Sequence, residues 1–200
     1  MKTTLYLLLT LESMNQRTIV RSLTTQDGTL VAMNDGMIVW RPRDGRPTRT
    51  SITDLPTVLL ALRGPMGPVD AAVLGTASGE VHVFTLPRME TIARFQLESG
   101  SIRALHLVAE GSMHFIAGTQ HGAVWSLDDS QTERCQHLFS IDGPVSSLHL
   151  EGDNVHVRSG WYHHVRTWDG QHHDVNNTAE SFKVKRFKRL DRSYLLPNAA

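Results

Sequence analysis

The sequence predicts an all-β protein, a small β-propeller of about four four-stranded blades, and three observations support this. Short apolar strands recur about every 40 residues, and each closes on one of Leu23, Leu62, Leu105 and Leu148. The next strand of every repeat closes on a glycine, at Gly36, Gly79, Gly122 and Gly160. Each glycine precedes a third strand whose residues alternate between apolar and polar, as in "VHVF". Repeats of this length with four short strands are typical of propellers.

Each repeat contains the same four elements in the same order. The predicted first strands are 19–23, 58–62, 101–105 and 144–148, and the second strands are 29–36, 71–79, 114–122 and 154–160. A glycine after Asp, Ser or His indicates a tight hairpin that needs a positive φ. The third strands are 37–42, 80–87, 123–129 and 161–170, and they are ended by Pro or by Asp-rich turns. More polar fourth strands follow at 48–54, 91–98, 135–142 and 172–177, as expected of an exposed outer strand.

The chain divides into residues 1–16, the blades over 17–175, and a basic C-terminal segment over 176–200. We expect "TLYLLLTL" near the start to form a strand that completes the last blade by pairing with 181–187. Three alternatives remain for how the sheet edges at the two ends are covered: this arrangement, a fifth incomplete blade, or an open arc that dimerises or rests on a partner. An export signal is the alternative for the first residues, but the apolar run is short and Glu12 follows it.

Composition indicates ordinary globular material. Hydrophobic residues make up 40% and charged residues 20% of the 200 residues, and no apolar run reaches the length of a membrane span. Cys135 is the only cysteine, so an internal disulfide is excluded. A free thiol fits a reducing compartment, and we expect a cytoplasmic protein.

The repeats resemble the WD-repeat family over roughly residues 17–170. "GPVSSLHL" (143–150) is similar to a first strand of that family, and "VLGTASGEVHVF" (73–84) to its second-to-third hairpin. "VRTWDG" (165–170) resembles the family's closing signature and holds a Trp-Asp pair. No Gly-His pair precedes any first strand, so the resemblance is to a degenerate member and its His–Asp hydrogen-bond network is not carried over. The resemblance implies a propeller that mediates protein interactions.

A histidine cluster after Gly160 is the candidate metal site. Its members are His163, His164, His172, His173 and Asp174. A hairpin would pair the strands that carry them, but adjacent residues of a strand point to opposite faces, so at most half can converge. A polar blade edge is the alternative reading.

The candidate partner-binding residues are aromatic and basic. They are Trp161, Tyr162, Lys183, Lys185, Arg186, Lys188 and Arg189. A basic segment with interleaved aromatics suits a protein partner, the protein's own acidic body, RNA or an anionic surface. One short segment offers few phosphate contacts, so nucleic acid ranks lower. The arginine-rich stretch 41–49 is predicted to be a solvated loop, with an anion contact as the alternative.

The sequence predicts a non-catalytic protein-interaction scaffold. No nucleophile–base arrangement or paired carboxylates stand out, so we expect neither enzyme activity nor a cofactor. The partner would be another protein or a second copy of the chain. Two alternatives remain: a metal- or ligand-binding propeller that uses region 163–174, and contact with RNA or an anionic surface through 182–192.

Overall fold

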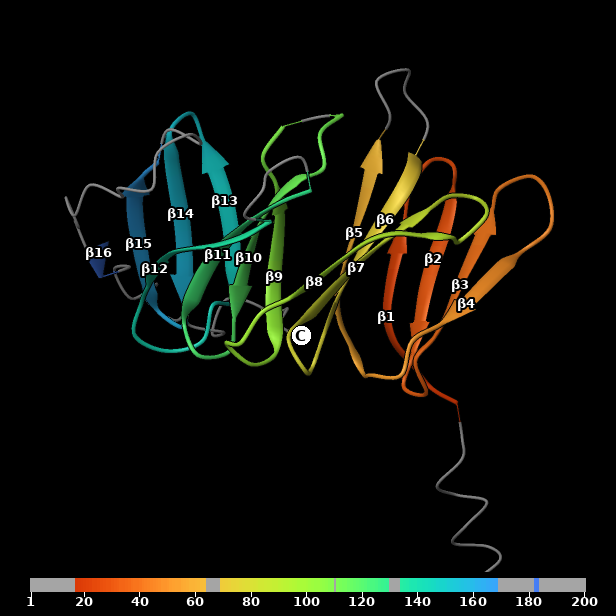
Figure 1. Ribbon diagram of the computed structural model, residues 1–200, viewed down its shortest axis with the longest axis horizontal. Coiled ribbons are helices and arrows are strands. Elements are labelled where there is room, and N and C mark those ends of the chain that lie inside the picture. Colours follow the sequence, from red (N-terminus) through yellow and green to blue (C-terminus); the bar gives the residue numbers. More distant parts are fainter. Residues whose placement is uncertain (1–16, 64–68, 110, 130–133, 169–181, 184–200) are drawn as a thin grey trace, which may run out of the picture.

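The computed structural model describes residues 17–63, 69–109, 111–129, 134–168 and 182–183, and the regular elements of this part are all strands (Figure 1). The first sheet contains β1 (Ile19–Thr24), β2 (Gly28–Met33), β3 (Met37–Pro42) and β4 (Thr48–Ser51). The second contains β5 (Pro56–Arg63), β6 (Val69–Thr76), β7 (Glu80–Thr85) and β8 (Thr91–Gln96). The third contains β9 (Ile102–Leu107), β10 (His114–Thr119), β11 (Ala123–Asp128) and β12 (Cys135–Ser140). The fourth contains β13 (Ser147–Glu151), β14 (Asn154–Ser159), β15 (Tyr162–Thr167) and β16 (Phe182–Lys183).

Every sheet is an antiparallel meander whose strands follow chain order. The first strands β1, β5, β9 and β13 contact one another in succession, so the sheets stand side by side like consecutive propeller blades. The first and fourth sheets lie at opposite ends of this row (Figure 1). The described part of the chain confirms the predicted four-stranded repeats, and it forms a row of four blades.

The apolar core lies between the sheets rather than within them. Three clusters fill the three spaces between successive sheets, and their largest fully buried side chains include Phe84, Phe115 and Ile116. Trp40 is 3% exposed in the cluster between the first and second sheets. No single sheet could bury such a face alone, so the blades stabilise one another.

Two glycines allow neighbouring sheets to approach closely. A Cβ added to Gly75 would lie 2.6 Å from Cγ2 of Ile102, and one added to Gly118 would lie 2.3 Å from Cγ1 of Val145. Ile102 and Val145 are fully buried and belong to the start of the following blade. Any side chain at these glycines would therefore force the next sheet away.

The repeated glycine of the hairpins fixes the outer strand of each of the first three sheets. Gly79 and Gly122 have φ angles of 91° and 84°, which glycine adopts without a steric penalty. Their carbonyl oxygens accept hydrogen bonds from the backbone N–H groups of Leu97 (2.9 Å) and Ile141 (3.0 Å), which follow the fourth strands. A Cβ on Gly122 would lie only 2.1 Å from the carbonyl oxygen of Ile141. The glycine thus serves the turn and the docking of the fourth strand at once.

The last sheet departs from the pattern in three places. Its first strand begins at Ser147 rather than at residue 144, because the N–H of Val145 bonds to the carbonyl oxygen of Thr119 on the third sheet. Its hairpin has two turn residues, Gly160 and Trp161. Its fourth strand is β16, not 172–177, which lies outside the described residues together with 1–16. β16 lies within the segment 181–187 and pairs with β15. The strand predicted near the start, which was expected to pair with 181–187, lies outside the described residues, so that pairing stays a prediction.

Gly122→Ala should destabilise the protein by at least about 2 kcal/mol, since it adds a positive-φ penalty to a backbone clash. Gly152→Ala is the matched control, because Gly152 also has a positive φ but has open space where its Cβ would lie. Chemical denaturation of both variants measures the difference. Equal losses in the two variants would show that the contact with the outer strand contributes nothing.

Candidate functional site

The two ends of the row are the places where the repeat presents a sheet face that no other described sheet covers. Register identifies equivalent positions: Gly75 pairs with Val81 and Gly118 with Val124, and both pairs pack against the next sheet. In the last sheet the same pair is Arg158 and His163. Arg158, a long cationic residue, occupies the position at which the inner sheets need a glycine for close contact with the next sheet. A further sheet could therefore not pack on this face as the inner sheets pack on one another. We call it the last-sheet end face, formed by Ser147, His149, His156, Arg158, His163 and Val165.

Histidine rings form a row across this end face. The ring centroids of His149 and His156 are 6.2 Å apart, and those of His156 and His163 are 5.2 Å apart. Nδ1 of His156 lies 3.1 Å from Nε2 of His163, so one ring donates to the other. His106 on β9 continues the row, with its ring 5.3 Å from that of His149.

Two histidines of the row, His163 and His106, favour the neutral imidazole. Burial lowers the pKa of His163, and repulsion from His156 and Arg158 lowers it further, with a smaller effect of His164. Burial likewise lowers the pKa of His106, assisted by His149. Closely spaced rings cannot all be protonated without mutual repulsion.

The hairpin beside this face carries the most exposed aromatic residue of the described chain. Trp161 is 79% exposed and Tyr162 is 48% exposed. Gly160, with a φ of 56°, opens the two-residue turn, and Ser159 pairs with Tyr162 directly below it. A tight turn therefore presents the indole with little backbone freedom. The other predicted candidates lie elsewhere: Lys183 is on β16 opposite Tyr162, and Lys185, Arg186, Lys188 and Arg189 lie outside the described residues.

The structure separates the two described members of the predicted metal cluster. His163 lies on the end face, whereas His164 pairs with the buried Val157 and faces the third sheet. Nε2 of His164 is buried without a hydrogen-bond partner in the part of the chain that the structure describes. No group of three metal-binding side chains converges within that part. His172, His173 and Asp174 lie outside it, so the full cluster stays a prediction.

At the opposite end of the row, the first sheet has its own uncovered face. Thr29 pairs with Arg41 there, at the position of the buried pairs Ala72–Phe84 and Phe115–Leu127. We call this the first-sheet end face. Its central residues line a hollow of about 730 Å³ and are Met37, Val39, Arg41, Pro47, Thr48 and Arg49.

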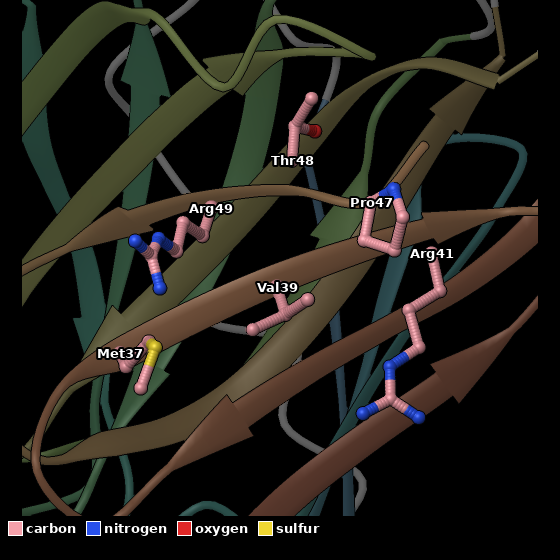
Figure 2. Close-up of a pocket in the computed structure, with 6 residues that line it drawn as sticks. All are labelled: Met37, Val39, Arg41, Pro47, Thr48 and Arg49. Carbon is pink, nitrogen blue, oxygen red and sulfur yellow. The ribbon is translucent and has the colours of Figure 1, made fainter. Parts of the chain in front are cut away.

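Figure 2 shows how the side chains of this hollow are arranged. Val39 lies in the middle, with Met37 and Arg49 on one side and Arg41 on the other. Arg49 pairs with Val39 across β3 and β4, and both arginines are exposed. β3 ends at Pro42 and β4 begins at Thr48, as the predicted strands 37–42 and 48–54 do. Arg41 and Arg49 therefore lie on strands, and only residues 43–47 of the stretch 41–49 connect them. The pairing of Val39 with Arg49 requires the hairpin register, which the sequence pattern did not reveal.

Comparisons with known proteins agree with this architecture. No protein-family profile matches the chain. The chain is 25% identical over 135 residues to U3 small nucleolar RNA-associated protein 21 of Saccharomyces cerevisiae, a stretch that covers 65% of this chain and 14% of that protein. The WD40 repeats of RRP9 superimpose with a TM-score of 0.64 at 13% identity, over 81% of this chain and 51% of that one. This is a WD-repeat-like propeller fold.

Two computationally designed proteins also share the WD-repeat-like arrangement. The Ika4 protein matches with a TM-score of 0.60 at 17% identity, over 77% of this chain and 93% of that one. The Ika8 protein matches with a TM-score of 0.59 at 15% identity, over 84% of this chain and 48% of that one. The chain thus spans about half of two of the solved structures that it resembles and a small part of the yeast protein. In the described part of this WD-repeat-like chain, no helix is long and apolar enough to cross a membrane.

Arg158→Gln should raise the pKa of His163 toward its ordinary value of 6.5, because it removes one of the charges that oppose protonation. NMR titration of the imidazole signals measures this shift, and Arg103→Gln on the third sheet is the control. The unfolded chain binds more protons than the folded one between the folded pKa and 6.5, so stability falls as the pH drops through that window. An unchanged His163 midpoint in Arg158→Gln would contradict the proposed coupling.

Proposed function

We propose that the protein is a non-catalytic interaction scaffold and that the Trp161–Tyr162 hairpin anchors a protein partner. The observation that carries this proposal is the 79% exposure of Trp161 on a two-residue turn. The other tryptophans of the chain, Trp40, Trp125 and Trp168, pack in or against the clusters between sheets. An exposed indole on a rigid support is the kind of residue that dominates binding energy at protein interfaces.

The surroundings of Trp161 support a protein rather than a small-molecule partner. Tyr162 adds a second half-exposed ring, and its ring centroid lies 6.5 Å from that of His164. Aromatic side chains with few rotatable bonds lose little entropy when a partner covers them. The exposed aromatic pair lies at a hairpin turn, whereas small-molecule sites are concave.

The WD-repeat-like fold supports the general role, since propellers expose many loops and edges on a rigid frame. The similarity to U3 small nucleolar RNA-associated protein 21 covers too little of that protein to transfer its association to this chain. The identity of the partner therefore rests on experiment. The proposal includes the absence of catalysis, which the WD-repeat-like fold supports by analogy.

Trp161→Ala should weaken partner binding by roughly 30-fold or more, because a buried indole at an interface is worth about 2 kcal/mol or more. Ile92→Ala is the matched control, since Ile92 is 47% exposed on β8 of the second sheet. Both substitutions are at exposed positions and should leave the free energy of unfolding almost unchanged.

The measurement has two steps. Affinity capture from extracts of the native host, quantified by mass spectrometry, compares the wild-type protein with the two variants. Calorimetry with the purified partner then gives the affinities. A partner that binds Trp161→Ala as tightly as the wild type would refute the hairpin as the anchor.

A further inference from the structure

We infer that the first-sheet end face is a second interaction surface, which binds an acidic protein segment that carries an apolar side chain between its carboxylates. The surface lies at the opposite end of the row from Trp161 (Figure 1) and does not depend on it.

The first step is the departure from the repeat. The positions of Phe84 and Leu127, which are 1% and 0% exposed between sheets, correspond to Arg41 in the first sheet. A blade packed here in the manner of the inner ones would bury the guanidinium of Arg41 against apolar side chains. Burying an unpaired charge is costly, so an occupant must supply an anionic group.

The second step is the arrangement around Val39. Arg41 follows Val39 by two residues on β3, and Arg49 lies beside Val39 on β4, so guanidinium groups flank an apolar floor of Met37 and Val39 (Figure 2). Within the described residues, no ion pair neutralises either arginine, whereas the neighbouring Arg17 is bonded to Asp35 at 2.7 Å. Arginine forks bind carboxylates with well-defined geometry.

A third observation widens the surface. Two further hollows adjoin the central one. A hollow of about 600 Å³ shares Met37 and Arg49 with it, and a hollow of about 520 Å³ shares Arg41. Together they extend along β3 and β4 and past the ends of β1 and β2. This extent suits a peptide segment better than a single small ion.

Charge decides against the two other occupants. A second copy that placed its last-sheet end face here would bring the positive charge of Arg158 toward Arg41 and Arg49, and these like charges repel one another. A nucleic acid would gain few phosphate contacts from two arginines beside an apolar floor. An acidic segment with one apolar residue can pair its carboxylates with the two arginines and pack its apolar side chain on Met37 and Val39.

The test uses the full chain and three fluorescein-labelled probes. The first probe is a short peptide with one leucine flanked on each side by two glutamates. The second replaces every glutamate with glutamine, and the third is an oligothymidylate of equal negative charge. The variant is the double substitution Arg41→Gln and Arg49→Gln, and its charge-matched control is Arg63→Gln with Arg103→Gln, both exposed positions on inner sheets. Circular dichroism confirms that the variants stay folded.

We expect fluorescence anisotropy to show that the glutamate peptide binds in the micromolar-to-millimolar range and that added salt weakens it. The double variant should bind roughly tenfold more weakly, while the control changes less than about twofold. Trp161→Ala should leave this binding unchanged, so that the failure of one proposal is distinguishable from the failure of the other.

Four outcomes would overturn the inference. These are no binding of the glutamate peptide, equal binding of the glutamine peptide, equal binding by the double variant, and tighter, arginine-dependent binding of the oligothymidylate. A dimer in sedimentation analysis that the double variant dissociates would assign the face to a second copy instead.

Discussion

The close approach of one sheet to the next is the constraint on which this structure depends. A four-stranded sheet of 40 or so residues has too little apolar surface to be stable alone, and only a neighbouring sheet can cover its face. Gly75 and Gly118 permit that contact, because the side chains of Ile102 and Val145 occupy the space that a Cβ would need. The repeated residues of the sequence therefore specify the contacts between neighbouring sheets as well as the strands themselves.

This constraint explains why the ends of the row are chemically different from its interior. The same register position that carries Gly75 and Gly118 carries Arg158 in the last sheet, and the position of Phe84 carries Arg41 in the first. A face that remains in water, or that meets a partner of another kind, needs polar groups where an inner face needs aliphatic ones. Both end faces are polar, yet they differ: one has stacked imidazoles and the other has arginines around an apolar floor.

The strands were predictable because their signals are local. Alternation, the spaced glycines and the Pro or Asp breaks identify most strands to within a few residues, and the spacing gave the blade order. Long-range contacts produced the errors. The start of β13 depends on a bond from Val145 to the third sheet, and the outer strand β16 does not follow β15 directly in the sequence as the fourth strands of the other sheets follow their third strands. The strand ends on either side of Pro47 were predicted, but only the hairpin register shows that Val39 lies beside Arg49.

The hairpin at Gly160 and Trp161 was also identified in part from local sequence signals, and the structure supplies the rest. The importance of the region after Gly160 was visible in the sequence as a failure of the repeat, and the structure gives it a physical form: a turn one residue shorter than those at Gly79 and Gly122. In the shorter turn Trp161, rather than a glycine, directly precedes β15, and its side chain is 79% exposed. Because a side chain at a tip cannot pack against its own sheet, its exposure is a direct consequence of the altered turn. The shorter turn thus accounts for the exposed indole on which the proposed partner contact rests.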